Sequence, residues 1–326
     1  RPWVPRRTPA VRDARESAAA RRLCGVAALA FGMLAVAATG AATGAATGTA
    51  SGAASAWQVR DDEGRNLSLP GPPQRVVSLS PGATAMLFAA GGGARVVGTP
   101  DFSVEPDGAR TIVRIGDSHG FDLERILGLH PDLIVAWTGG FSEAQLLPFE
   151  RAGLVVYRHR VTRLADLPAS IERLGALLDT GAVAQPAAAE LRRRIEALRA
   201  RYHRARAPRI LVQVWDRPVY TIGGAQLIDD AVSLCGYDNI YRELHDAAPA
   251  VSLESIAARD PEVILAVAAD EAAAQEWIQH WHAFPSMSAV RSGRLLSFVD
   301  ARLSRLGPEV VDATEALCAR LASATP

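Results

Sequence analysis

Two stretches of the chain, LERILGLHPDLIVA at residues 123–136 and LESIAARDPEVILA at residues 253–266, carry the same pattern. They align with a constant offset of 130 residues, and six of their fourteen positions are identical. Asp122 and Ser252 precede them where a helix N-cap belongs, and in both stretches a proline separates the helical part from an apolar run that is typical of a buried strand. The chain is therefore predicted to repeat one helix–proline–strand unit in two similar lobes.

Short runs rich in β-branched residues alternate with helical patterns on both sides of this repeat. Strands that are separated by helices indicate parallel sheets, so we predict an α/β fold with a parallel, Rossmann-like sheet in each lobe. The predicted strands are 76–79, 95–98, 132–137 and 154–157 in the first half, and 209–215, 262–267 and 294–299 in the second.

A helical pattern between the two halves predicts a stiff connector. From Pro186 to Ala205, apolar side chains recur at helical spacing, and a helix of this length spans about 30 Å at 1.5 Å per residue. The stripe consists of Leu191, Ile195, Leu198 and Tyr202. The predicted boundaries are 57–183 for the N-terminal lobe, 184–206 for a single interlobe helix and 207–326 for the C-terminal lobe.

The charge of the chain is unevenly distributed. Overall 35 basic residues, all of them Arg, balance 35 acids, but residues 1–56 hold seven Arg and only two acids. Arg21 and Arg22 precede the apolar run Leu23–Ala38, which is shorter than the roughly 20 residues of a membrane span, and small residues surround position 56. We therefore predict that 1–56 is a signal peptide for export to the periplasm, with an uncleaved membrane anchor as the alternative. The mildly acidic remainder does not favour nucleic-acid binding.

Two cysteines follow the predicted leader, Cys235 and Cys318. In an oxidising compartment such a pair tends to form a disulfide, which here would hold the C-terminal helix to an earlier one. Two buried free thiols are the alternative.

Aromatic residues follow predicted strands in both halves. Trp137 ends one predicted strand, Trp215 ends another, and Tyr220 follows Trp215 five residues later. Glycines follow the aromatic residues in both halves, where they let a ligand approach the backbone. Because ligands bind beyond the carboxyl ends of parallel strands, these side chains are predicted to form two walls of an interlobe cleft, although each indole would also fit a protein core. Further candidates for the walls are Phe102, His119 and Arg305.

Glu124 and Glu254 occupy the first turn of the repeated helix in each lobe. An acid there complements the helix dipole, which is a sufficient structural reason for its presence. Equivalent positions on two lobes also give two separated negative charges, which a two-fold symmetric partner with Arg side chains can contact.

One short motif raises an enzymatic alternative. Gly116–Gly120 matches the G-x-S-x-G nucleophile elbow of α/β hydrolases, and a β-prone run at 111–115 precedes it. An elbow starts its helix at the serine, whereas here Asp122 is the better N-cap and Ser118 is predicted to lie in a loop. A secreted serine hydrolase is therefore the alternative from another class, and no catalytic residue is predicted.

The sequence predicts no metal site. His119 alone is a weak signal for a ligand of haem iron or cobalt, and His280 and His282 flank Trp281 on a predicted surface helix. No cluster of histidine and carboxylate residues indicates a bare metal ion.

Several motifs resemble the periplasmic cobalamin-binding proteins of bacterial ABC importers. The resemblance covers nearly all of residues 73–321, and part of it is shared with a wider class that binds haem and iron siderophores. Trp137 with its glycines and the cysteine pair are the narrower signals. The motifs are RVVSLSP at 75–81, DLERI at 122–126, PDLIVAW at 131–137, LCGYDNI at 234–240, VSLE at 251–254 and LC at 317–318.

The resemblance implies a class III periplasmic binding protein, with two lobes joined by one rigid helix and limited hinge motion. It implies that Trp137 and Tyr220 pack on a corrin. It also implies that Glu124 and Glu254 contact the permease and that the two cysteines are bridged.

We therefore expect a monomeric, non-enzymatic protein of the periplasm. It is expected to deliver cobalamin or a related corrinoid to an ABC permease and ATPase complex in the inner membrane. A flat corrin or porphyrin offers a large stacking area to aromatic rings, so haem or a ferric siderophore is the alternative ligand within the same class.

Overall fold

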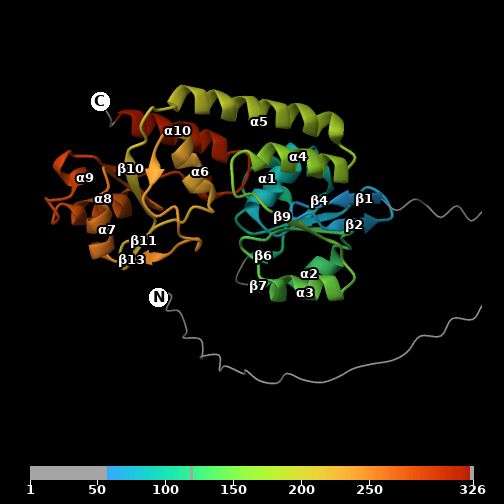
Figure 1. Cartoon of the computed structure of the whole chain (residues 1–326). Helices are drawn as coiled ribbons and strands as arrows, with labels where there is room; N and C mark the ends of the chain where they lie inside the picture. The colour runs from blue at the N-terminus through green and yellow to red at the C-terminus, as the bar shows by residue number, and fades with distance from the viewer. Residues whose placement is uncertain (1–56, 118–119, 324–326) are drawn as a thin grey trace, which may run out of the picture. The chain divides into compact units, whose positions relative to one another are not determined.

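The computed structural model describes residues 57–117 and 120–323, which form two α/β lobes and a long helix between them (Figure 1). The predicted fold class is therefore confirmed. The predicted leader, 1–56, lies outside the described residues, and so do Ser118 and His119. In the part of the chain that the structure describes, no helix combines the length and the apolar character that a bilayer crossing requires.

The N-terminal lobe is built on a parallel five-stranded sheet in the order β5-β4-β3-β8-β9. β8 (Leu133–Trp137) lies between two parallel neighbours and is fully buried from Leu133 to Ala136. A continuous apolar run of this kind is typical of a strand that is covered on both faces. Around it lie β3 (Val76–Ser78), β4 (Val96–Thr99), β5 (Val113–Arg114) and β9 (Val156–His159). Two antiparallel pairs flank the sheet, β1 (Trp57–Arg60) with β2 (Asn66–Leu69) and β6 (Gly116–Asp117) with β7 (Gly120–Phe121).

β9 begins two residues later than predicted. The amide of Leu154 donates to the carbonyl of Phe149, so this residue closes the last turn of the preceding helix instead of opening the strand.

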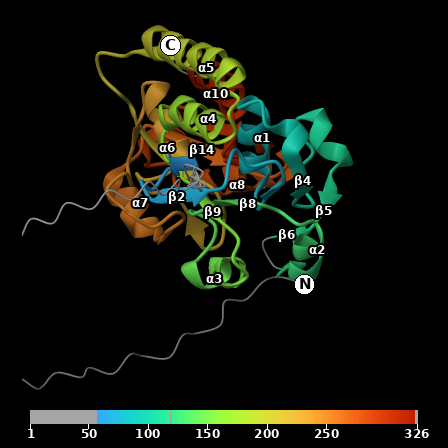
Figure 2. The same cartoon turned by 90° about the vertical axis from the view of Figure 1, so that its right-hand side faces the viewer.

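Alternate residues of the N-terminal sheet face two different layers of helices. Val76, Leu133 and Val135 pack toward α1 (Pro81–Ala89) and α4 (Asp166–Leu177), whereas Val77 and Ile134 pack toward α2 (Leu123–Gly128) and α3 (Glu143–Arg151). Figure 2 shows α4 on one side of the strands and α2 with α3 on the other. The sheet therefore separates two cores, as its period-two pattern dictates.

The C-terminal lobe repeats this plan with four parallel strands in the order β12-β10-β14-β15. β14 (Val263–Val267) takes the place of β8, since each follows the proline of the repeated unit and lies between two parallel neighbours. The other strands are β10 (Arg209–Gln213), β12 (Asp238–Asn239), β15 (Leu295–Phe298) and an antiparallel pair of β11 (Val219–Tyr220) with β13 (Ala250–Val251). The helices are α6 (Leu227–Leu234), α7 (Leu253–Arg259), α8 (Glu271–Trp281), α9 (Ser288–Arg291) and α10 (Val310–Ser323).

The connecting helix α5 runs over Gly181–Tyr202, so the predicted start at 184–186 was too late and the predicted end at 205–206 too far along the chain. Its buried stripe extends back to Ala184 and Ala188, whose small side chains give a weak apolar signal in the sequence. Ala184 lies against Gly175 of α4, where a Cβ would come within 2.2 Å of the Ala184 Cβ. The helix therefore starts where its close contact with α4 starts, five residues before Pro186.

The predicted caps and disulfide are present. The Asp122 side chain accepts a hydrogen bond from the amide of Arg125 at the start of α2, and Ser252 accepts one from the amide of Ser255 at the start of α7. Cys235 and Cys318 form a disulfide with their Cα atoms 4.9 Å apart. This bond joins the end of α6 to α10, which confirms that the C-terminal helix is covalently held to an earlier one.

Candidate functional site

A cavity of about 410 Å³ lies between the two lobes. Segments that follow the carboxyl ends of β8 and β9 line it on one side, and they include Trp137 and Arg160. Gln226, His245 and Leu306 line it from the C-terminal lobe. Its position beyond the ends of parallel strands is where such sheets bind ligands, so this cavity is the candidate binding site.

Of the predicted ligand-binding residues that the structure describes, only Trp137 lines this cavity. The segment Thr138–Gly140 folds against its half-buried indole. A Cβ on Gly139 would lie 2.5 Å from the indole ring, and one on Gly140 would lie 2.4 Å from it. The glycines were expected to admit a ligand to the backbone, but their close neighbour is the Trp137 ring itself, which they hold in place on the cavity wall.

Behind this wall, four side chains converge on the fully buried carboxylate of Asp62. The His159 Nδ1 atom lies 2.8 Å from it, and Tyr157 and Ser170 donate hydroxyl hydrogen bonds of 2.6 and 2.7 Å. Arg173 adds a contact of 2.7 Å through its Nε atom. We refer to these five residues as the Asp62 hub.

Burial of Asp62 by itself raises the pKa of the carboxyl group, but its hydrogen bonds and its attraction to His159 outweigh that effect and hold the pKa well below its usual range. Asp62 also accepts a hydrogen bond from the amide of Arg160, and Thr138 donates its amide to the carbonyl of His159. The hub therefore fixes the two segments that carry the N-terminal wall of the cavity. The His159 Nε2 atom is buried and has no hydrogen-bond partner among the described residues.

The Asp62 hub contains a serine, a histidine and an aspartate in mutual contact. All three side chains are fully buried and Ser170 donates to the carboxylate, so no substrate reaches this serine. Ser118, the nucleophile of the hydrolase alternative, lies outside the described residues.

On the opposite wall, His245 is exposed and Gln226 is half-buried. The glycine pair 223–224 packs against the turn before His245: a Cβ on Gly223 would lie 2.3 Å from the carbonyl oxygen of Leu244. These glycines, like those after Trp137, therefore serve contacts within the protein. Sequence reasoning did not find Arg160, Gln226 or His245, although Arg160 carries the signal of directly following a strand.

The two aromatic residues predicted for the second wall do not line the cavity. The Trp215 side chain is 59% exposed, and its ring contacts Trp277 of α8 at a centroid distance of 6.3 Å. Tyr220 is half-buried at the end of β11, where it pairs with Ala250. Their role as ligand contacts stays a prediction.

Arg305 is already paired with an acid of the other lobe. Its Nη1 atom lies 3.4 Å from the Glu105 carboxylate, and the next residue, Leu306, approaches Gly82 of α1 so closely that a Cβ there would lie 2.7 Å from its backbone. Burial, together with repulsion from Glu105, raises the pKa of the nearby Glu309. Phe102 is 70% exposed in the loop after β4. Neither Arg305 nor Phe102 lines the cavity, so their predicted ligand contacts also remain untested.

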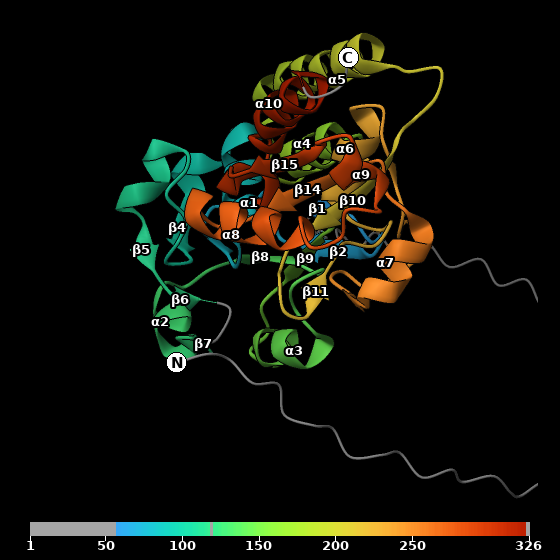
Figure 3. The same cartoon turned by 90° about the vertical axis from the view of Figure 1, so that its left-hand side faces the viewer.

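The two acids predicted for docking are exposed. Both lie in the first turn of a capped helix, Glu124 on α2 and Glu254 on α7. A backbone hydrogen bond and one with the Ser252 side chain lower the pKa of Glu254, so it is ionised at neutral pH. Figures 1 and 3 show α2 and α7 on the side of the described structure that faces away from α5. This placement suits a partner that approaches from one side.

The sequence predicted no metal site, but the fold brings together one histidine and two carboxylates that the sequence pattern did not reveal. Asp216, Glu276 and His280 bring one possible metal-ligating atom each to within 4.8 Å of one another. Asp216 comes from the loop after β10, sixty residues before Glu276, so sequence spacing could not reveal it. The spacing of Glu276 and His280 by four residues on a helix is the signal that was available.

Comparisons with known proteins agree with this architecture. A family model described as periplasmic binding protein matches residues 76–299. The vitamin B12-binding protein of Vibrio cholerae serotype O1 is 30% identical over 255 residues, which is 78% of this chain and 91% of the relative.

Solved structures extend the comparison. The periplasmic vitamin B12 binding protein BtuF of Vibrio cholerae superposes with a TM-score of 0.69 at 30% identity and covers 78% of this chain and 98% of its own. The periplasmic heme-binding protein RhuT from Roseiflexus sp. RS-1 has a TM-score of 0.63 at 22% identity, with coverage of 77% and 98%, and shares the fold. Family model, curated relatives and fold all agree, and the chain belongs to the periplasmic binding protein family.

Proposed function

We propose that this protein is the solute-binding component of an ABC importer and that its ligand is cobalamin or a related corrinoid. Proteins of this family bind solutes and work with ABC permease and ATPase components, and they are not enzymes. The proposed place of work is the periplasm, and the proposed partner is a permease and ATPase complex in the inner membrane.

The observation that carries the ligand proposal is the interlobe cavity with Trp137 held on its wall, in a chain that is 30% identical to vitamin B12-binding proteins. An indole that its own glycines hold in place loses little conformational freedom when a flat ring system stacks on it. The volume of the interlobe cavity, about 410 Å³, lies near the lower end of the range for ligand pockets in general. A ligand as bulky as cobalamin is therefore expected to lie across the mouth of the cavity rather than to be enclosed by it.

The polar residues of the cavity suit the periphery of such a ligand. Arg160, Gln226 and His245 offer hydrogen-bond donors toward amides or carboxylates on a ring edge. The Trp215, Tyr220, Phe102, His119 and Arg305 side chains remain proposed contacts of the wider mouth.

Haem or a ferric siderophore is the second candidate ligand. The observation that favours haem is the exposed imidazole of His245 in the cavity wall, because imidazole is a common axial ligand of haem iron.

The proposed function is tested by titrating the purified protein separately with cyanocobalamin, haemin and a ferric siderophore, with tryptophan fluorescence and ligand absorbance as readouts. Saturable one-to-one binding of cyanocobalamin is expected, and it should weaken in Trp137→Ala. A Trp215→Ala variant measures whether that indole also contacts the ligand. Binding of haemin alone, weakened by His245→Ala, would replace the corrinoid proposal with the haem one.

A further inference from the structure

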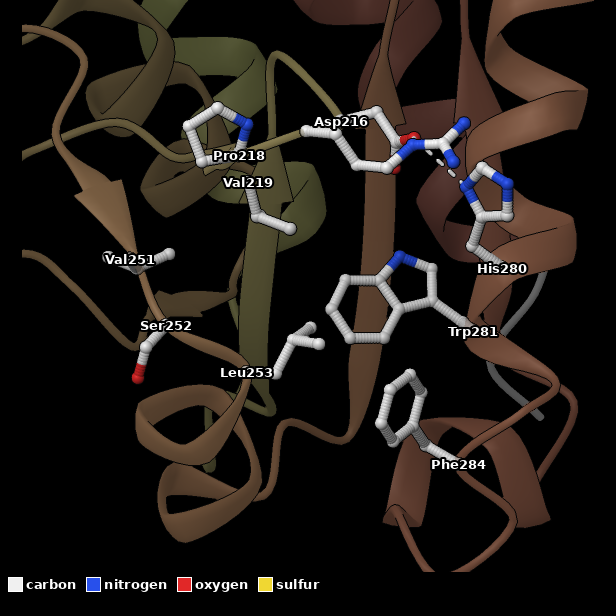
Figure 4. Close-up of a pocket in the computed structure, with 10 residues that line it drawn as sticks. Asp216, Pro218, Val219, Val251, Ser252, Leu253, His280, Trp281 and Phe284 are labelled. Atoms are coloured by element: carbon white, nitrogen blue, oxygen red, sulfur yellow. Dashed lines mark hydrogen bonds and ion pairs between the residues drawn. The ribbon is translucent and has the colours of Figure 1, made fainter.

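A second pocket, of about 330 Å³, lies entirely within the C-terminal lobe and is separate from the interlobe cavity. Figure 4 shows its polar end, where Asp216 faces His280, and its apolar part, where Leu253 faces the rings of Trp281 and Phe284. The polar end belongs to the cluster of Asp216, Glu276 and His280.

The backbone brings the three ligating side chains together from two elements. Glu276 and His280 lie one helical turn apart on α8, so their side chains share one face. The Nδ1 atom of His280 lies 2.9 Å from the Oδ2 atom of Asp216. Ligands at about 2.0–2.2 Å in a tetrahedral zinc site are roughly 3.4 Å apart, so side-chain rotation alone can close a cluster whose atoms lie within 4.8 Å.

A second layer of contacts orients Asp216. The buried amide of Gln213 donates to the Oδ1 atom of Asp216 over 3.2 Å, and its oxygen accepts a hydrogen bond of 2.8 Å from the indole of Trp281. The Asp216 side chain is only 13% exposed. The other carboxylate oxygen, Oδ2, is thereby left facing His280. Second-layer partners orient the ligands of metal sites in the same way.

A positive charge already occupies the cluster. The guanidinium of Arg217 contacts the Asp216 carboxylate at 2.9 Å and the Glu276 carboxylate at 3.1 Å. The Arg217 side chain is 73% exposed, and ion pairs of such exposed side chains contribute little to stability. Arg217 therefore balances the two acids while the site is empty, and it can turn into solvent when a cation of higher charge arrives.

We propose that Asp216, Glu276 and His280 bind a zinc ion or a divalent transition metal with similar ligand preferences, with Arg217 displaced. One imidazole nitrogen and two carboxylate oxygens suit such metals, whereas magnesium and calcium prefer oxygen ligands alone. The ion links the loop after β10 to α8. The metal-site proposal does not rest on the identity of the transported ligand, so it stands or falls separately from the proposed function.

Zinc chloride is titrated calorimetrically into the metal-free protein, purified without a polyhistidine tag, and magnesium chloride is titrated in parallel. One zinc ion per chain and no magnesium binding are expected. Glu276→Gln and His280→Gln are expected to weaken zinc binding tenfold or more, and both positions are exposed enough that the variants fold, which circular dichroism checks. His282→Gln, two residues from His280 but outside the cluster, is the matched control and is expected to leave zinc binding unchanged.

Arg217→Ala separates a metal site from a simple ion-pair network. If the guanidinium competes with the metal, its removal raises zinc affinity about fivefold, because two weak exposed ion pairs no longer have to break. Cobalt absorbance bands that appear in this variant and vanish in His280→Gln would support the same coordination. The proposal is overturned if zinc does not bind, if it binds equally to Glu276→Gln and His280→Gln, or if Arg217→Ala lowers the affinity.

Discussion

In the N-terminal lobe, Tyr157, His159 and Arg173 converge on the buried carboxylate of Asp62, while in the C-terminal lobe a disulfide joins α6 to α10. Both cross-links tie segments that are far apart in the sequence. The first depends on an ionised acid, and the second depends on an oxidising environment. The two lobes, which share one repeated unit, are therefore stabilised by different chemistry. The stability of the N-terminal lobe is expected to respond to pH, and that of the C-terminal lobe to reductant.

The outer faces of the two lobes differ as well. Next to α2 and α3, the rings of Phe121 and Phe141 meet at a centroid distance of 5.5 Å and pack against the apolar core. Between α7 and α8, the corresponding region is open and forms the pocket in which Leu253 is 40% exposed. Glu124 and Glu254 are therefore equivalent by sequence and by capping but have unlike neighbours, so a partner meets two unequal surfaces.

The largest effect is expected from removal of the disulfide. Replacement of Cys235 and Cys318 by serine should lower the free energy of unfolding by about 4 kcal/mol, because the cross-link closes a loop with a sequence separation of 83 residues. Urea unfolding measures the loss, and the wild-type protein in reductant should match the double variant. A loss below about 1 kcal/mol would mean that the C-terminal lobe does not depend on this bond.

The Asp62 hub is the counterpart in the other lobe. Asp62→Asn should lower the free energy of unfolding at pH 7 by about 3 kcal/mol, because it breaks a buried ionic network. The pKa of Asp62 is depressed in the folded protein, so its contribution is present above the unfolded pKa of about 3.9 and is lost as the pH falls through the lowered folded pKa.

Urea unfolding of wild type and Asp62→Asn at a series of pH values checks this sign, and the gap between them should narrow below about pH 4. Asp107→Asn, at an exposed carboxylate, is the matched control and should change stability by no more than about 0.5 kcal/mol. The assignment of this lobe's stability to the hub would be contradicted if reductant abolished the difference in free energy of unfolding between wild type and Asp62→Asn, or if that difference widened in acid.

The pair Glu124→Arg and Glu254→Arg tests the two outer faces together. Reversal of both charges should weaken docking to the permease about a hundredfold, since each exposed acid that meets a basic partner counts for roughly a factor of ten. Transport stimulation in reconstituted vesicles measures the effect, and ligand affinity should not change. Glu196→Arg on α5, the helix on the other side, is the control (Figure 1). A parallel loss of ligand affinity would remove the docking role.

The smallest effect concerns the wall of the cavity. Trp137→Ala should weaken ligand binding about tenfold, which corresponds to about 1.4 kcal/mol for a lost stacking contact. Gly139→Ala should act in the same direction but less strongly, because its added Cβ would push the indole rather than remove it. Isothermal titration measures both, with Leu253→Ala outside the cavity as the control. Unchanged affinity in Trp137→Ala would place the ligand elsewhere.

Local patterns were sufficient to predict the repeated unit. The buried strands β8 and β14 follow from apolar runs after Pro131 and Pro261, and the caps Asp122 and Ser252 follow from their side-chain chemistry. These features depend on neighbours within a few residues. The start of α5 was missed because it depends on a glycine of another helix.

The site was harder to predict because its geometry is nonlocal. Asp62 gives no signal in a loop after β1, since its partner His159 lies 97 residues away. His245 and Gln226 line the cavity from a region where a glycine pair packs against Leu244, a contact between segments about 20 residues apart in the sequence. The pattern of strand ends selected Trp137, which lines the cavity, but it could not determine which other aromatic residues turn toward the same space.

One apolar core runs without interruption from the N-terminal sheet through α5 to the C-terminal sheet, and it includes Leu133, Ile195 and Val263. Any wide swing of one half against the other would expose this shared interior to water, at a cost proportional to the uncovered area. The proposed permease, which must distinguish the ligand-bound protein from the empty one, therefore has little conformational change to detect. The proposed ligand, which is expected to project from the cavity mouth, would then be the part of the complex that changes most on loading and the surface that the proposed permease contacts.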